Sequence, residues 1–260
     1  MTIRKKPSPF LFSEKQASPS RIRHGLDGLA EFFFPSRCLI CGKIFKPENS
    51  SYFCNTCYDG FLFIHKPVCS KCGAMFPTEQ GEDHLCGQCL KSEPAFDRAR
   101  SIGLYEGTLR KAIHGFKYNR KSLLGKPLSL ILAEQGRKLI TPNTYDALIP
   151  VPLHSNRLRQ RGFNQAQVMA RKAGKAWRIP VDWMSLQRKK TALPQTMLSK
   201  NARRKNIRDS FYCIPDSIKG KKLLLIDDVY TSGSTANECA KTLKKNGATT
   251  VDVLTLARTQ

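Results

Sequence analysis

Two adjacent carboxylates, Asp227 and Asp228, follow an apolar run in this chain. An apolar strand delivers such acids to the carboxyl edge of a sheet, where α/β proteins bind ligands. The next residues offer hydroxyls and free backbone N–H groups ahead of a helix, which suits an anion. Together the two parts predict a site for a ribose that carries a 5-phosphate. The residues of the predicted phosphate loop are Thr231, Ser232, Gly233, Ser234 and Thr235.

Two other interpretations of this segment compete with a sugar-phosphate site. Apolar residues ahead of paired acids also occur in the Walker B strands of nucleoside triphosphatases, but the chain has no G-x-x-x-x-G-K-[ST] loop. A plainer alternative is an ordinary buried strand whose acids cap the next helix. A pair of acids followed by Thr-Ser-Gly-Ser-Thr is much less common than a single acid at a strand end, so we favour the ligand site.

Cysteine spacing gives the second chemical signal. Eight of the ten cysteines form four C-x-x-C pairs, and C-x-x-C-G occurs twice, so the segment looks duplicated. Four thiolates make a closed tetrahedral shell, which is typical of structural rather than catalytic zinc. We expect two structural Zn²⁺ sites, resembling a double zinc ribbon, formed by consecutive pairs. Their ligands are Cys38, Cys41, Cys54 and Cys57 for the first site, and Cys69, Cys72, Cys86 and Cys89 for the second.

Other uses of these cysteines fit less well. A disulfide framework needs an oxidising compartment, and the chain shows no export signal. A thioredoxin-like site needs one C-x-x-C beside a βαβ unit, and haem attachment needs a following histidine. An iron–sulfur cluster also takes four cysteines, so that alternative stays open. The thiols must stay reduced and the chain shows no export signal, which together predict a cytoplasmic location. No apolar run reaches about 18 residues, so we expect no membrane insertion.

The charge of the chain is large and uneven. The net charge is +24, and residues 157–208 hold fifteen Lys and Arg against a single acid, Asp182. A charge run is usually a solvated face, but this one is long and one-sided. A bound diphosphate would use two or three of these cations. The surplus favours a larger polyanion, and we expect single-stranded DNA or another nucleic acid as a partner.

Length and periodicity predict three parts in these 260 residues. Residues 1–25 form a basic tail without periodicity, which we expect to be disordered. Residues 26–92 comprise a short amphipathic helix over 26–36 and the two ribbons, and residues 93–260 form the larger domain. Alternating elements there predict a Rossmann-like α/β fold with a mostly parallel sheet. We expect strands over 96–105, 145–151, 211–214, 222–226 and 250–257, and helices over 108–116, 123–139, 162–177 and 236–247.

Residues 223–235 resemble the 5-phosphoribosyl 1-diphosphate (PRPP) motif of type I phosphoribosyltransferases. The resemblance implies that Asp227 and Asp228 contact the ribose 2′- and 3′-hydroxyls and that the following loop holds the 5-phosphate. Purine-salvage members carry a third Asp, proposed as a base, where this chain has Thr231. The loop therefore offers no obvious proton acceptor.

A third motif widens the resemblance to nearly the whole chain. Pro-Val-Pro-Leu-His154 precedes an arginine cluster that ends in Arg-Gly-Phe-Asn164, and His-Gly-Phe-Lys117 lies upstream. Arginines on such a loop can grip diphosphate oxygens bidentately. With the ribbons, this order over residues 30–258 is similar to the ComF/GntX family, which is implicated in natural competence for DNA uptake. The resemblance also implies competence helicase or transport proteins as partners.

The expected activity follows from this resemblance. The larger domain should bind PRPP with Mg²⁺, because departing pyrophosphate needs its charge neutralised. The resemblance assigns Asp227 and Asp228 to the sugar, and Lys117, Arg159 and Arg161 to the leaving group. A catalyst would transfer phosphoribosyl to a nitrogen acceptor through an oxocarbenium-like transition state. The alternative is a non-catalytic factor that handles single-stranded DNA or senses PRPP, and the sequence leaves both open.

Overall fold

The structure is a computed structural model that describes residues 35–47, 52–78, 80–118, 122–189, 210–214 and 217–260. The chain divides into two compact units, Met1–Phe61 and Leu62–Gln260. The smaller unit holds the first four paired cysteines, and the larger holds the second four together with the strands described below. The sequence predicts a domain boundary after residue 92, with both ribbons in one domain, whereas the two compact units separate the ribbons. The expected tail lies outside the described residues, as does nearly all of the expected helix over 26–36.

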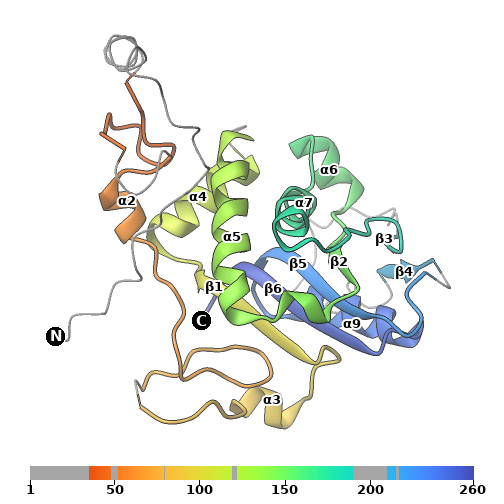
Figure 1. Cartoon of the computed structure of the whole chain (residues 1–260). Helices are drawn as coiled ribbons and strands as arrows, with labels where there is room; N and C mark the ends of the chain where they lie inside the picture. The colour runs from red at the N-terminus through yellow and green to blue at the C-terminus, as the bar shows by residue number, and fades with distance from the viewer. Residues whose placement is uncertain (1–34, 48–51, 79, 119–121, 190–209, 215–216) are drawn as a thin grey trace, which may run out of the picture. The chain divides into compact units, whose positions relative to one another are not determined.

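The described part of the larger unit contains two β-sheets. Their strands are β1 Arg98–Leu104, β2 Ala147–Pro150, β3 Leu186–Arg188, β4 Phe211–Cys213, β5 Lys222–Tyr230 and β6 Thr250–Arg258. The main sheet has the order β1-β6-β5-β2, and every neighbouring pair is parallel (Figure 1). The short strands β3 and β4 pair antiparallel. The runs of buried residues in β5 and β6 follow from this arrangement, because a parallel sheet is covered on both faces. The predicted fold class is confirmed.

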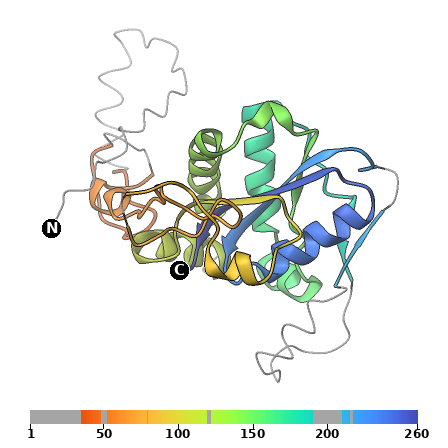
Figure 2. The ribbon, with the colours of Figure 1, turned by 90° about the horizontal axis from the view of Figure 1, so that it is seen from below.

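Helices cover both faces of the main sheet. The smaller unit contains the short helix α2 Asn55–Asp59. The helices of the larger unit, as far as it is described, are α3 Gly87–Lys91, α4 Gly107–Tyr118, α5 Gly125–Leu139, α6 Ser155–Arg161, α7 Gln165–Trp177 and α9 Ser234–Lys245, with 3₁₀ turns η1 Ser122–Leu124 and η2 Pro142–Thr144. The strands lie between α5 and α7 on one side and α9 on the other (Figure 2). Trp177 Nε1 joins α7 to α5 by donating to the Ala133 carbonyl at 2.9 Å.

The second ribbon packs into the core on the α9 side of the sheet. Cys69, Cys72 and Cys89 are buried in the same cluster as Cys239 and Leu243 of α9. Cys239 is therefore a core residue, as its position on the apolar face of the helix predicts. Among the described residues, no helix is long and apolar enough to cross a membrane.

Two elements near the predicted site differ from the expectation. The strand that carries the acids was expected to end at Ile226, but pairing with β6 continues as far as Tyr230 opposite Arg258. The acids therefore lie within β5. The arginine segment after β2 was expected to be a loop, whereas it forms α6, which ends at Gly162 in the left-handed conformation.

Candidate functional site

The two acids of β5 lie beside a lysine from another element. The Nζ of Lys117, in the last turn of α4, is 2.8 Å from Oδ1 of Asp228, and the two side chains are only 14% and 12% exposed. The backbone N–H of Asp228 donates to Oδ1 of Asp227 at 2.8 Å. A lysine predicted to contact the leaving group thus pairs with a predicted ribose contact.

The pKa of Asp227 lies above the ordinary value for an aspartate. Burial and then the negative charge of Asp228 raise the pKa of Asp227 to about 7. Backbone N–H donation from Asp228, together with the cations Lys117 and Arg161, acts in the opposite direction. Two carboxylates that repel each other at close range favour a cation between them. This donor set fits Mg²⁺, which takes one or two carboxylates together with phosphate oxygens.

Arg161, at the end of α6, supplies a second cation near the acids. Its Nη2 donates to the Tyr118 hydroxyl at 2.9 Å, and its Nη1 donates to Oε1 of Gln165 at 3.1 Å. The guanidinium also lies over the Tyr118 ring, 4.7 Å from the centroid. Among the described residues, the buried Arg161 Nε and Gln165 Nε2 have no hydrogen-bond partner. Buried donors without partners are costly, so they fit an anionic ligand at this edge.

Capping residues fix the two helices that bring this arginine to the sheet. The Nδ1 of His154 accepts the N–H of Asn156 at 3.2 Å at the start of α6. Asn164 caps α7 by accepting the N–H of Ala166 at 2.9 Å, and its amide donates to the Val151 carbonyl at 3.0 Å. The helix start is thereby tied to the end of β2.

Arg159 behaves differently from its neighbour. Its side chain is exposed on α6, where it donates to Asn156 Oδ1 at 2.6 Å. The described structure gives it no contact with the acid pair. Its assignment to the leaving group stays a prediction.

The predicted phosphate loop follows β5 and runs into α9. Thr231 and Ser232 are exposed, while Ser234 and Thr235 already belong to the first turn of the helix. Gly233 is the N-cap at φ 74° and makes no side-chain cap. The Ser234 N–H donates to Ser232 Oγ at 3.4 Å, so the helix start would offer an anion the later N–H groups of its first turn. A Cβ at this position would lie 2.2 Å from the hydroxyl of Tyr230. Only glycine fits this turn.

Each group of four cysteines comes together as predicted. The sulfur atoms of Cys38, Cys41, Cys54 and Cys57 lie within 4.8 Å of one another, and the same holds for Cys69, Cys72, Cys86 and Cys89. The Sγ atoms of Cys41 and Cys54 are 3.8 Å apart, and those of Cys72 and Cys86 are 3.7 Å apart. A tetrahedron with metal–sulfur bonds of about 2.3 Å has edges of roughly 3.8 Å. Both clusters therefore fit zinc geometrically.

Backbone donors prepare one thiol in each cluster for ligation. Burial raises the pKa of Cys69, but the N–H groups of Cys72 and Cys86, at 3.4 and 3.3 Å, help to lower it to about 6. Burial likewise opposes ionisation of Cys38, and backbone N–H groups bring its pKa to about 7. Because zinc binds thiolates, this donation favours metal binding.

Known proteins share both parts of this architecture. A family model described as a double zinc ribbon domain matches residues 29–90. Competence protein F of Haemophilus influenzae is 32% identical over 235 residues, which cover 87% of this chain and 98% of that protein. This chain belongs to the ComF family. DNA utilization protein YhgH of Escherichia coli O157:H7 is 33% identical over 198 residues, which cover 75% of this chain and 85% of that protein.

A solved structure also aligns with this ComF-family chain. It is the glutamine phosphoribosylpyrophosphate amidotransferase of B. subtilis, complexed with ADP and GMP. The alignment has a TM-score of 0.35 and 21% identity, and it covers 50% of this chain and 25% of that one.

The ComF-family site contains residues that the sequence analysis did not select. Tyr118 and Gln165 accept hydrogen bonds from Arg161 and orient it. Burial, and then the charge of Arg157, lower the pKa of Arg188 in β3, while Asp227 acts in the opposite direction. Arg258 ends β6 in the buried core, 6% exposed. In the sequence, only its position could have indicated a role for Arg258, because it is a charged residue at the carboxyl end of an otherwise apolar strand.

Proposed function

We propose that this ComF-family chain binds PRPP with Mg²⁺ at the carboxyl end of β5. The observation that carries the proposal is one cluster, in which Asp227 and Asp228 directly precede a glycine-capped helix start and face Lys117 and Arg161. Acids suit ribose hydroxyls and a bridging Mg²⁺, the helix start suits a phosphate, and the cations suit a diphosphate. We also propose that the eight paired cysteines bind two structural zinc ions, and thiols that must stay reduced support a cytoplasmic location.

Each part of the cluster has a separate task in this proposal. Asp227 and Asp228 would position the ribose and could also hold Mg²⁺, which would neutralise charge on the diphosphate. Residues 231–235 would hold the 5-phosphate through backbone N–H groups and hydroxyls. Lys117, which pairs with Asp228, would also reach the diphosphate, and Arg161 would support the same group. Arg159 joins them once a diphosphate is present.

Two versions of this function differ in whether a phosphoribosyl group is transferred. A transferase would break the bond from ribose C1 to diphosphate and form one to a nitrogen acceptor, with a proton leaving that nitrogen. Thr231 stands where a proton acceptor occurs in purine-salvage enzymes, which supports a binding-only role. The intact acid pair followed by the hydroxyl- and glycine-rich loop supports transfer. Release of pyrophosphate from PRPP with nucleobases or DNA decides between them.

Titration calorimetry with PRPP, with and without Mg²⁺, tests binding. We expect Mg²⁺-dependent heat from the wild type and none from Asp227→Asn/Asp228→Asn, because the double variant loses the sugar and metal contacts together. Glu82→Gln/Glu134→Gln removes the same charge at exposed positions and is the matched control. Undiminished binding in the Asp variant refutes the site.

We further propose that the chain contacts single-stranded nucleic acid through a basic groove. The specific observation is a cavity of about 350 Å³ between α5 and α7 whose lining includes Lys126, Arg171, Lys172 and Lys175. Within the described part of the chain, the last three form no ion pair with an acid. A cationic groove without acids is complementary to a phosphate backbone. Six of the fifteen cations counted over 157–208, Arg203 and Arg204 among them, lie outside the described residues.

The salt dependence of DNA binding tests the groove. Each phosphate contact on a single strand contributes about −0.7 to the slope of log K against log salt. Replacing Arg171, Lys172 and Lys175 with Ala should therefore flatten the slope by roughly 2 if each contacts a phosphate. The control neutralises Lys219, Lys241 and Lys245, which are exposed elsewhere on the larger unit. Equal slopes in the two triple variants would refute the groove as the contact surface.

A further inference from the structure

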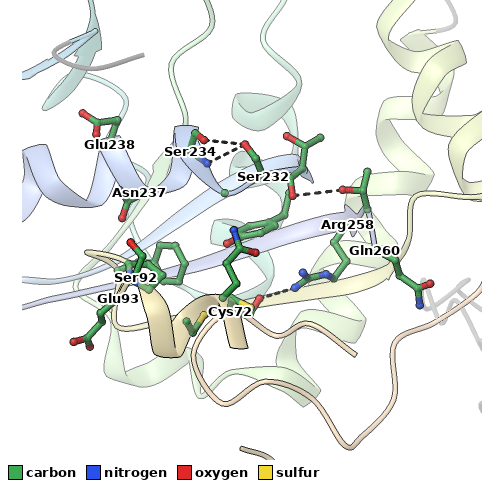
Figure 3. Close-up of a pocket in the computed structure, with 17 residues that line it drawn as sticks. Cys72, Ser92, Glu93, Ser232, Ser234, Asn237, Glu238, Arg258 and Gln260 are labelled. Carbon is green, nitrogen blue, oxygen red and sulfur yellow. Dashed lines mark hydrogen bonds between the residues drawn. The ribbon is translucent and has the colours of Figure 1, made fainter. Parts of the chain in front are cut away.

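A second cavity lies behind the phosphate loop (Figure 3). Its volume is about 490 Å³. One wall consists of residues 231–234 and the first turn of α9, and another consists of Cys72, Cys89 and α3 of the second ribbon. The end of β6, at Arg258, closes it. The second zinc ribbon and the phosphate loop thus border the same space.

Arg258 links these two walls directly. Its Nη1 donates to the carbonyl oxygen of Cys72 at 2.6 Å, and its guanidinium lies over the ring of Tyr230, 5.1 Å from the centroid. Tyr230 in turn lies directly beneath Gly233, the cap of α9. The side chain of Arg258 is almost fully buried, and its Nε has no partner among the described residues. A buried guanidinium depends strongly on the few acceptors it has, because each lost bond leaves a desolvated charge.

The segment that leads out of the ribbon provides a second link. The N–H of Ala95 donates to Oδ1 of Asn237, in the first turn of α9, at 2.7 Å. The ring of Phe96 packs edge-on against Tyr230, with centroids 6.2 Å apart. The ribbon is therefore joined to the helix start by a hydrogen bond and to the residue beneath the loop by an aromatic contact.

We propose that the second ribbon is a structural wall of the phosphate-loop site, and that Arg258 is the positioning residue that makes the loop depend on the zinc-bound ribbon. The Cys72 carbonyl belongs to a turn between two of the four cysteines, so its place depends on the metal that fixes them. Without that acceptor, Arg258 leaves Tyr230, and the support beneath Gly233 is lost. This coupling rests on the proposed function only in naming PRPP as the ligand. The first ribbon belongs to the other compact unit, and the residues that line this cavity all come from the larger one.

Hydrogen exchange of the ligand-free full chain tests the coupling without any assumption about the ligand. Cys86→Ser removes one ligand of the second cluster, and Cys54→Ser removes its counterpart in the first. We expect amides over 228–239 to exchange about tenfold faster or more in Cys86→Ser, since their supporting wall opens locally, and at the wild-type rate in Cys54→Ser. Equal effects of the two variants would overturn the proposal.

Arg258→Met keeps every cysteine and so covers the case in which Cys86→Ser fails to fold. It should keep two zinc ions and still speed exchange over 228–239, while Arg258→Lys, which retains one donor group, should restore part of the protection. Arg98→Met is the matched control, because it breaks an arginine contact of 3.3 Å to Asp252 near the other end of β6. If the amides over 228–239 of Arg258→Met exchange at the wild-type rate, the proposal is overturned.

Calorimetry with PRPP then separates this proposal from the proposed function. Wild-type binding that weakens about tenfold or more in Arg258→Met, with zinc retained, supports both. Faster exchange in Arg258→Met without any wild-type binding supports the coupling and refutes PRPP as the ligand. Wild-type binding that Arg258→Met leaves unchanged refutes the coupling.

Discussion

Replacing Asp227 with Asn should stabilise the ligand-free protein at alkaline pH, although the acid belongs to the proposed site. Burial and the charge of Asp228 raise the pKa of Asp227 from an ordinary 3.8 to about 7. Because the folded-state pKa is the higher one, the folded chain holds an extra proton between about pH 4 and 7. Stability therefore falls as pH rises through this window, and the full penalty applies above pH 7. Asn carries no charge and avoids it.

The size of this effect follows from the shift. A shift of about three units corresponds to roughly 4 kcal/mol, which is an upper limit because Asp227 keeps some solvent exposure. We expect a gain of about 1–2 kcal/mol at pH 8, shrinking toward zero near pH 4. Urea unfolding of wild type and Asp227→Asn between pH 5.5 and 8.5, with zinc present, measures it.

Asp228→Asn is the control in this experiment, because the neighbouring acid has a different environment. Its carboxylate pairs with Lys117 at 2.8 Å, and both side chains are mostly buried. Removing one partner of such a pair leaves an uncompensated charge, so we expect a loss of about 1–3 kcal/mol at pH 8. A loss in both variants, or a gain in Asp227→Asn that does not grow with pH, would refute this account of the acid pair.

Three further outcomes are expected. Mg²⁺-dependent PRPP affinity should rise from pH 6 to 8 and level off above, because protons compete with the cation at Asp227, and calorimetry at several pH values measures it. Elemental analysis should give two zinc ions for the wild type and one for Cys41→Ala, and iron in place of zinc would contradict this. Gly233→Ala should abolish PRPP binding, because its Cβ would collide with Tyr230, whereas Ser232→Ala should weaken binding only modestly, since most loop contacts come from backbone N–H groups.

The sequence predicted the elements around the site well where local periodicity decides structure. The strand before the acids, α9 and its end before Gly247 all follow from apolar spacing and glycine placement. Two local errors have physical causes. The length of β5 depends on its pairing with β6, which no single segment encodes, and α6 forms from a polar, arginine-rich stretch whose helical signal lies in its caps, His154 and Gly162.

Contacts between distant segments could not be predicted in this way. Arg258 and Cys72 are 186 positions apart, yet they share a hydrogen bond. The two ribbons have almost the same spacing in sequence, and only the structure shows that the second one packs on the sheet. Duplication predicts two similar metal sites, but it contains no information about what each copy packs against.

The acid pair illustrates the same limit at the level of chemistry. The sequence presents two identical carboxyl groups side by side, but the structure pairs one of them with a lysine and buries the other beside its neighbour's charge. Lys117 offsets the charge of Asp228, but the two acids still repel each other, and a further cation would relieve that repulsion while keeping both ionised. Under the proposed function, a ligand that brings Mg²⁺ with its own phosphate oxygens would supply that cation and use both acids at once. The electrostatic cost of keeping the acids adjacent would then favour binding of ligand and metal together.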